Sequence, residues 1–559
     1  MNDDESKYEK NDIDNKFDLS VFRTSEQRID LVQDSECPKH VIETVIEHDL
    51  DKSVVLATLI SKHIDDKMIK SISVKFDYTI DELHSMQLLM IAQKDDVRRK
   101  SFCAVPWNHV STNANGTVRM CCQMINNQGY EGEEAYGTVF KDNGTALTTT
   151  DNISEHRNST AWKKLRKEML GGHRSEICKL CWDEEDNGIG SRRTWTNQVF
   201  NETFDNAILN TAADGSINHE DFPIEHWDLR FGNKCNLACR SCGPTDSNLW
   251  YKDWEKFTGR NTFFNRGIGD VTIETDDNGS TIVKDSPFEW FDKTDLVSNI
   301  KNEISNIKRF YFTGGEPTIN HTHRELLQYT IDNGYAKDLI LDYNTNMAGV
   351  PGAIFKQWKE FKEVNLGMSI DGIYEHFEYI RYPGKWNTAY KNMKRIDNSE
   401  FTNLKASVTM TVSIMNILHL LDMQWWMREQ NWNSIDSNII VHNLYGPDYL
   451  NTQNIPKSMK SYITNRYRKF YVDIRKNWPN DNSWLSLTET RLEAVLTHMN
   501  SVEDDPSQWK TFFASGKKLD EIRKENWKES LEDIYKMVQF CTAKEMRKKD
   551  VKLATTGKR

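Results

Sequence analysis

Apolar and polar residues between positions 222 and 448 follow a regular pattern, in which short β-rich runs are separated by segments with the periodicity of amphipathic helices. The runs are rich in Val, Ile, Phe and Tyr, which favour strands. Strands separated by helical crossovers predict a parallel sheet with helices outside it. Six such units predict a partial (β/α)6 TIM-like barrel of the α/β class, because a closed barrel has eight. The expected strands are 226–231, 309–314, 339–344, 364–370, 407–412 and 438–444.

The segments on either side of this core have a different character. Residues 1–100, whose role the sequence does not indicate, and residues 449–559 show the patterns of amphipathic helices. Residues 101–195 are rich in cysteine, asparagine and glycine and predict a small domain with many turns. The insertion 245–307 separates the first two core strands and contains a hairpin expected to turn at Asn278-Gly279.

Length and charge narrow the class of protein. A chain of 559 residues is too long for one ordinary core, so several domains are expected. Its 72 Lys and Arg against 84 Asp and Glu give a formal charge of −12, which argues against general binding of nucleic acid through a basic surface. The start of the chain is polar and acidic, and no run of about 18 apolar residues occurs. We therefore expect a cytoplasmic protein with no signal peptide and no membrane contact.

Three of the ten cysteines, Cys235, Cys239 and Cys242, crowd into the stretch NKCNLACRSCGP directly after the first core strand. This is the carboxyl end of a strand, where α/β folds build their active sites. A closed tetrahedral site needs a fourth ligand, which this stretch lacks. The three thiolates can hold three irons of a [4Fe–4S] cluster and leave the fourth iron open to a small ligand. A partial zinc or ferredoxin-type site is the alternative.

The ends of the following strands carry matching signals. Gly314, Gly315 and Glu316 lie in FTGGEP after the second strand, Asn346 ends the third, and MSIDG ends the fourth. Together with the cysteine triplet, these motifs resemble the radical S-adenosylmethionine (SAM) superfamily over roughly residues 225–445. The resemblance implies a SAM-binding [4Fe–4S] cluster on the three cysteines.

The same resemblance implies further contacts to SAM. Glu316 supplies a carboxylate for the methionine ammonium, and the two glycines allow close approach to the ligand. Ser369 and Asp371 face the ribose and the methionine end, with Asn346 as a further candidate, and Arg381 in YIRYPGKW lies near the SAM carboxylate. The family usually has an aromatic residue before the third cysteine, where this chain has Ser241, so no adenine contact is assigned there.

Four more cysteines form a second group: Cys103, Cys121, Cys178 and Cys181. The first two flank a hairpin expected to turn at NANG, and the last two form a Cys-x2-Cys knuckle. This group resembles the twitch domain, the smaller relative of the SPASM domain, and the resemblance implies one auxiliary [4Fe–4S] cluster. A four-cysteine zinc site has similar spacings. Unlike in the family, the group precedes the barrel.

The other three cysteines receive no such role. Cys122 is an alternative to Cys121, although the family's Gly-x4-Cys spacing selects Cys121. Otherwise Cys37, Cys122 and Cys541 are expected to be buried thiols.

The function implied by the resemblance is reductive cleavage of SAM to a 5′-deoxyadenosyl radical, which abstracts hydrogen from a peptide or small molecule. An external electron donor such as flavodoxin or ferredoxin is also implied. An RNA-modifying radical SAM enzyme, an iron–sulfur redox protein that does not cleave SAM, and a structural zinc protein are the alternatives. No catalytic acid, base or radical relay can be chosen from the sequence.

Overall fold

The computed structural model describes residues 24–33, 37, 39–49, 51–61, 64–124, 141, 145–186, 188, 190–265 and 268–556. The chain divides into two compact units. The first comprises residues up to 103, 162–175 and 200–218, and the second comprises 104–161, 176–199 and the residues from 219 onward. Residues 101–195 are divided between these two units, and the expected domain bounds stay a prediction.

The first unit is helical, as the amphipathic pattern of the N-terminal region predicts. Its longest helix begins with a capping box, in which Thr79 and Glu82 each accept from the other's backbone N–H. Its core includes Ile42, Val45 and Ile72. Its helices are α2 (Ser25–Gln33), α3 (Lys39–His48), α4 (Lys52–Ala57), α5 (Asp66–Phe76), α6 (Ile80–Ser101), most of α9 (Thr160–Leu170) and α12 (Thr203–Asn210).

The second unit is built around an eight-stranded sheet in the order β11-β10-β9-β8-β7-β3-β1-β2. Adjacent strands from β3 to β11 are parallel, which confirms the expected α/β class and the parallel sheet. The curvature of a partial barrel stays a prediction. The six expected strands are observed as β3 (His226–Leu229), β7 (Arg309–Phe312), β8 (Ile340–Thr345), β9 (Glu363–Ser369), β10 (Leu404–Val412) and β11 (Ile435–Asn443).

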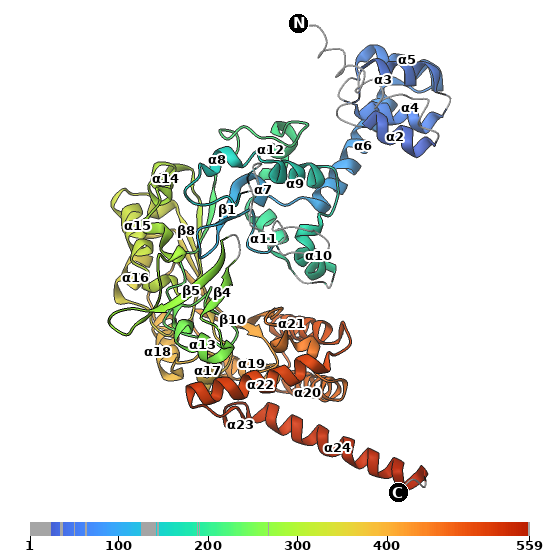
Figure 1. Cartoon of the computed structure of the whole chain (residues 1–559). Coiled ribbons are helices and arrows are strands. Elements are labelled where there is room, and N and C mark those ends of the chain that lie inside the picture. The colour runs from blue at the N-terminus through green and yellow to red at the C-terminus, as the bar shows by residue number, and fades with distance from the viewer. Residues whose placement is uncertain are drawn as a thin grey trace. The chain divides into compact units, whose positions relative to one another are not determined.

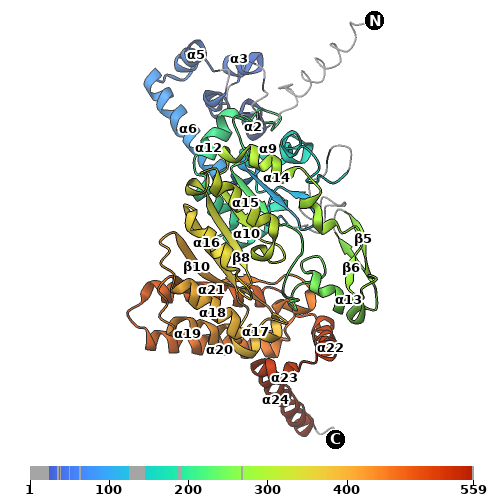
Figure 2. The same cartoon turned by 90° about the vertical axis from the view of Figure 1, so that its left-hand side faces the viewer.

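Helices connect the parallel strands and cover one face of the sheet. In Figure 1, α15, α16 and α18 form a column on the left, and Figure 2, in which that side faces the viewer, shows them in front of the strands. Crossovers that return each strand parallel to the last require such a layer. The connecting helices are α15 (His321–Asp332), α16 (Gly352–Gln357), α17 (Tyr374–Ile380), α18 (Trp386–Asp397) and α19 (His419–Glu429).

The two faces of the sheet differ in polarity. Along β9, Val364, Leu366 and Met368 are buried, and the residues between them are only half-buried. The same alternation occurs in β8 and β10. Successive side chains of a strand point to opposite faces, so one face packs on the helices and the other carries polar groups. The polar positions are Asp342, Asn344, Glu363, Asn365, Ser369, Lys405, Ser407, Thr409 and Thr411.

Strands β1 (His109–Thr112) and β2 (Val118–Arg119) extend this sheet beyond β3. β1 is parallel to β3, with His109 opposite His226 and Ser111 opposite Asp228. The expected hairpin is present: Asn113 N donates to Thr117 O at 2.8 Å, and Gly116 has a φ of +79°. The hairpin of the cysteine-rich region is therefore part of the core sheet.

The insertion between the first two core strands supports that hairpin. It contains α13 (Tyr251–Thr258), α14 (Leu296–Asn302) and a sheet of β4 (Thr262–Asn265), β5 (Gly269–Thr275) and β6 (Thr281–Val283), which turns at Asn278-Gly279 as expected. Trp290 Nε1 donates to Ala114 O at 3.1 Å, and Asn115 Nδ2 donates to Asn265 Oδ1 at 2.6 Å. A Cβ added at Gly116 would lie 2.7 Å from Trp290 Cγ, so the turn needs glycine for space as well as for its φ.

The remaining helices of the second unit lie at the C-terminal end and in the cysteine-rich region. The expected helical C-terminal region is observed as α20 (Lys457–Asn477), α21 (Asn482–Asn500), α22 (Pro506–Arg523), α23 (Trp527–Ser530) and α24 (Glu532–Thr556). Within the described residues, no helix combines the length and the apolar character needed to cross a bilayer. The cysteine-rich region adds α7 (Val105–Asn108), α8 (Ile153–His156), α10 (Lys179–Asp186) and α11 (Arg192–Val199).

Candidate functional site

The loop that carries Cys235, Cys239 and Cys242 follows β3 and is fixed by side chains at both ends. Asn233 Nδ2 donates to Pro244 O at 2.8 Å and so ties the start of the loop to its end. Trp250 Nε1 donates to Cys239 O at 2.9 Å. These bonds hold the backbone in a compact turn that no regular secondary structure would supply.

A second segment, which follows α17, pairs with the middle of the loop. Ala238 N donates to Tyr382 O at 2.5 Å, and Arg240 N donates to Ile380 O at 2.8 Å. This pairing brings Arg381 to the thiols, with Nη1 4.0 Å from Cys239 Sγ. The expected family motif after the fourth strand therefore lies directly on the cysteine loop.

The three thiols lie close enough to act on one another electrostatically. Cys239 and Cys242 contact each other, and this contact lowers the pKa of Cys239 and raises that of Cys242. Burial raises the pKa of Cys235 to about 12. Thiolates are soft ligands, and a bound iron–sulfur cluster deprotonates them. A donor set of three adjacent thiols beside a guanidinium fits an anionic [4Fe–4S] cluster.

The glycine-rich loop after β7 lies on the start of the cysteine loop. Gly314 and Gly315 have φ values of +77° and +52°, which other residues rarely adopt. A Cβ at Gly315 would lie 2.3 Å from Lys234 O, and the N–H of Glu316 donates to this carbonyl at 2.9 Å. Glycine is therefore required for the two loops to touch.

Glu316 is buried, and its carboxylate accepts four hydrogen bonds from its own chain. Oε1 accepts from Thr318 N at 3.1 Å, from Thr318 Oγ1 at 2.6 Å and from Thr345 Oγ1 at 2.9 Å. Oε2 accepts from Asn346 N at 2.7 Å and keeps room for a second donor. Burial raises the pKa of Glu316 against the effect of these bonds. The carboxylate therefore joins the ends of β7 and β8, and Oε2 is the atom left for an ammonium.

Asn346 reaches the cysteine loop from β8. Its Nδ2 lies 3.8 Å from Cys235 Sγ and donates to Asn236 Oδ1 at 2.7 Å. Its Oδ1 accepts from Ala348 N at 2.9 Å. The amide of Asn346 is therefore largely occupied by its own chain, and Asn346 is placed to orient the cysteine loop.

Asp371 forms an ion pair with Arg381 in this structure. Its Oδ2 forms an ion pair of 2.9 Å with Arg381 Nη2, and its Oδ1 accepts from Thr411 N at 2.9 Å. These bonds give Asp371 a positioning role toward Arg381, and each oxygen keeps room for a second donor, so its expected contact with SAM stays a prediction. Ser369, two residues earlier, lines the cavity on the polar face of the sheet.

That cavity measures about 910 Å³ and reaches from the polar face of the sheet to Cys122 and α11. Ion pairs neutralise two charged positions on this face: Arg309 with Asp342 at 2.6 Å, and Lys405 with Glu363 at 2.5 Å. Most of its lining carries hydroxyl, amide or charged groups, including Thr313, Asn344, Asn365, Ser369, Ser407, Thr409 and Thr411. A cavity of this kind suits a polar ligand.

Two arginines of the cavity wall were not identified from the sequence. Arg192 on α11 stacks on Trp195 at 4.4 Å, and Arg230 follows β3. Among the described residues, Nε and Nη2 of Arg192 and Nε of Arg230 are buried without a hydrogen-bond partner. The buried carboxylate of Asp228 acts electrostatically on both guanidinium groups. The signal for a polar cavity was present in the alternation of polar residues along β8, β9 and β10, since strands buried on both faces read as apolar runs. No local signal pointed to the two arginines.

The second cysteine group is divided by the two units. Cys103 is the last residue of the first unit, whereas Cys121, Cys178 and Cys181 lie in the second. Within the second unit, Cys122 contacts Cys121, and its charge acts on Cys181, whose pKa burial raises to about 11. Cys122 lines the cavity, whereas the sequence predicted only an ordinary buried thiol at this position. A four-thiol auxiliary site stays a prediction.

No protein-family model and no curated protein sequence matches the chain. Several solved structures match part of the chain. Native anSMEcpe with bound AdoMet is 16% identical, with 46% of this chain aligned to 62% of that one and a TM-score of 0.29. Streptococcus suis SuiB bound to S-adenosylmethionine is 15% identical, with 56% aligned to 64% and a TM-score of 0.29.

These neighbours bind S-adenosylmethionine. A further structure is SuiB bound to precursor peptide SuiA, at 15% identity, 57% and 64% coverage and a TM-score of 0.27. The chain spans less than two thirds of each of these neighbours. Because the TM-scores are below 0.5, the function has to follow from the geometry of the site.

Proposed function

We propose that this protein is a radical SAM enzyme that acts on a peptide or a polar small molecule. One observation carries the proposal: the three-cysteine loop touches the GGEP loop, the Asn346 turn and Arg381 at the same edge of one parallel sheet. An iron–sulfur protein that only carries electrons needs four protein ligands for its cluster and does not need these neighbouring loops. When bound at these cysteines, a [4Fe–4S] cluster with one open iron supplies the electron that cleaves SAM to methionine and a 5′-deoxyadenosyl radical.

The residues around the thiols have separate tasks. Cys235, Cys239 and Cys242 would hold the cluster. Glu316 Oε2 would accept from the methionine ammonium, in a charge-assisted hydrogen bond. Arg381, oriented by Asp371, would face the negative charge of the cluster and the SAM carboxylate. Ser369 would contact the ribose from the cavity wall.

The cavity supports a polar substrate that carries an anionic group. Among the described residues, Arg192 and Arg230 face one buried carboxylate between them, that of Asp228, whereas Arg309 and Lys405 on the same face each have an ion-pair partner. One carboxylate does not balance two buried guanidinium groups, so a carboxylate of the substrate is the further complement that we propose. A peptide with an acidic side chain meets this requirement, and one neighbour was solved with a precursor peptide. RNA modification is less favoured, because the chain carries a formal charge of −12.

We propose an auxiliary [4Fe–4S] cluster at Cys103, Cys121, Cys178 and Cys181. Four thiol ligands leave no open iron, so its role would be electron transfer or structure rather than substrate binding. Zinc is the competing metal.

Metal analysis after anaerobic reconstitution tests this assignment. Two [4Fe–4S] clusters give about eight irons per chain, and replacing Cys235, Cys239 and Cys242 with Ala leaves about four. Zinc in place of the remaining iron would contradict the auxiliary cluster alone. An iron content unchanged by the triple replacement would contradict the main site.

A further inference from the structure

Arg523, the last residue of α22, is buried beside the cysteine loop although it lies 281 positions after Cys242 in the chain. Its side chain is 0% exposed. Nε forms an ion pair of 2.9 Å with Asp253 Oδ2 on α13. The guanidinium packs on two aromatic rings, 4.6 Å from the centroid of Trp250 and 4.6 Å from that of Tyr382.

These two aromatic residues also hold the cysteine loop. The indole N–H of Trp250 donates to Cys239 O, and the carbonyl of Tyr382 accepts from Ala238 N. The guanidinium is therefore one ring away from the loop backbone on both sides.

The Nη1 and Nη2 atoms of Arg523 are buried and have no hydrogen-bond partner among the described residues. One ion pair at Nε uses one of the five N–H donors of a guanidinium. Leaving the others buried without an acceptor is costly, and such groups commonly mark a missing ligand or ion. A negative charge at the cysteine loop would therefore interact with this guanidinium through its electric field, across one aromatic ring.

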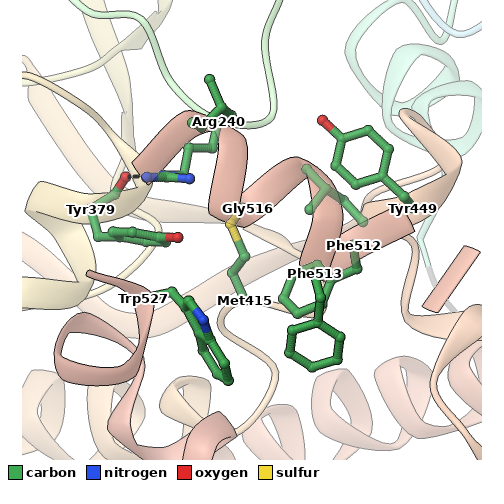
Figure 3. Close-up of a pocket in the computed structure, with 10 residues that line it drawn as sticks. Arg240, Tyr379, Met415, Tyr449, Phe512, Phe513, Gly516 and Trp527 are labelled. Atoms are coloured by element: carbon green, nitrogen blue, oxygen red, sulfur yellow. Dashed lines mark hydrogen bonds between the residues drawn. The ribbon is translucent and has the colours of Figure 1, made fainter. Parts of the chain in front are cut away.

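Several contacts fix α22 at this place. Arg240, between two of the cysteines, donates to Asp520 Oδ1 at 2.6 Å and to Glu525 Oε2 at 2.8 Å. Asp520 also accepts from Tyr379 Oη at 2.9 Å. Figure 3 shows Arg240 and Tyr379 side by side next to α22, around a small apolar pocket that includes Phe512 and Trp527. The helix is thus anchored on the loop and is not an appended element.

We propose that α22 completes the cluster site, and that Arg523 is a second cation beside Arg381 that stabilises the reduced, more negative cluster. This positioning role rests on the proposed function of Cys235, Cys239 and Cys242. Charge near an iron–sulfur cluster sets its reduction potential. Helix α22, which has no role assigned from its sequence pattern, would thereby be part of the proposed SAM site.

Two substitutions of opposite electrostatic sign test the proposal in the reconstituted full-length protein. The readout is the midpoint potential of the electron paramagnetic resonance (EPR) signal that changes when SAM is added, because this change identifies the cluster. Arg523→Gln removes a positive charge and should shift the midpoint to more negative values. Asp253→Asn removes the negative partner of Arg523 and should shift it to more positive values. Lys517→Gln, an exposed position on the same helix, should leave it unchanged.

The outcomes separate the possible roles. Unchanged midpoints in Arg523→Gln and Asp253→Asn, with iron content retained, would overturn the proposal. Loss of SAM affinity at an unchanged midpoint would also overturn it, by making Arg523 a ligand of SAM. If Arg523→Gln does not fold, the direction in which Asp253→Asn shifts the midpoint potential still tests the proposal. A wild-type protein that binds no iron at the three cysteines would overturn the proposed function itself, and with it the role of Arg523.

Discussion

At the scale of single residues, the site depends on positions where only one side chain fits. Gly315 has a positive φ and no space for a Cβ, because Lys234 O would lie 2.3 Å away. Gly334 also has a positive φ, +77°, but a Cβ there would meet nothing within 4 Å. Comparing substitutions at these two glycines therefore separates the effect of the backbone conformation from the effect of the contact between the loops.

Gly315→Ala should destabilise the protein more than Gly334→Ala. At both positions, alanine with a positive φ costs about 1–2 kcal/mol, and the clash at Gly315 adds to this cost. We expect Gly315→Ala also to lose iron from the main cluster, whereas Gly334→Ala should retain it. Chemical unfolding and iron analysis of both variants measure these effects. Equal stability and equal iron content would contradict the proposed contact between the loops.

Glu316→Gln should weaken SAM binding while the cluster stays in place. The amide keeps an oxygen for Thr318 and Thr345, but it loses the charge that would attract an ammonium. We expect at least about a tenfold loss of SAM affinity, or about 1.4 kcal/mol. Titration of the reconstituted protein with SAM, followed by EPR, measures this, with the exposed Glu429→Gln as the control. An unchanged affinity would remove Glu316 from the SAM site.

At the scale of secondary-structure elements, the sequence predicted most of what lies in one continuous segment. The six parallel strands were predicted because β-branched and aromatic residues cluster in short runs. Two hairpins were predicted from Asn-Gly turns at 115–116 and 278–279. The pairing of β1 with β3 was not predicted, because it joins residues more than 100 positions apart, such as Ser111 and Asp228.

The candidate site shows the same division. The cysteine triplet, Gly314, Gly315 and Glu316 were identified from local motifs, and the structure brings them into contact. Arg523 and Arg192 could not be identified, because each reaches the site from a helix outside the motif-bearing strands. The ion pair of Asp371 with Arg381 was not predicted, because the motif does not show which side chains face each other.

The knuckle at the start of α10 gives a prediction at this scale. Replacing both Cys178 and Cys181 with Ala should remove about four irons and leave SAM cleavage at the main site intact. If the auxiliary cluster transfers electrons, substrate turnover should be lost. Cleavage and turnover are assayed separately, and circular dichroism checks the fold. A substrate-dependent change in the auxiliary EPR signal would contradict a cluster with four protein ligands.

At the scale of the whole molecule, the core contains histidines that burial keeps neutral. Burial lowers the pKa of His323 to about 3 and that of His498 to about 4. Their pKa in the unfolded chain is about 6.5, so on acidification the unfolded state takes up protons first. Their contribution to stability is therefore full above about pH 6.5 and is lost as the pH falls toward the folded-state values.

The melting temperature of the protein should accordingly fall between pH 6.5 and pH 5. Each such histidine contributes a slope of up to about 1.4 kcal/mol per pH unit in this window, where most carboxylates remain ionised. His323→Gln should give a flatter profile, since it removes one of these groups. Thermal unfolding across the pH range measures both profiles. A melting temperature that stays constant or rises on acidification would contradict this account.

The central claim is that the cysteine loop, the GGEP loop and Arg381 form a site for reductive cleavage of SAM. The most direct measurement is the formation of 5′-deoxyadenosine by the reconstituted, reduced protein in the absence of substrate. We predict slow formation of 5′-deoxyadenosine and methionine in equal amounts, abolished when Cys235, Cys239 and Cys242 are replaced with Ala. A wild-type protein that carries the cluster and binds SAM, yet forms no 5′-deoxyadenosine above the level of the triple variant, would contradict the claim.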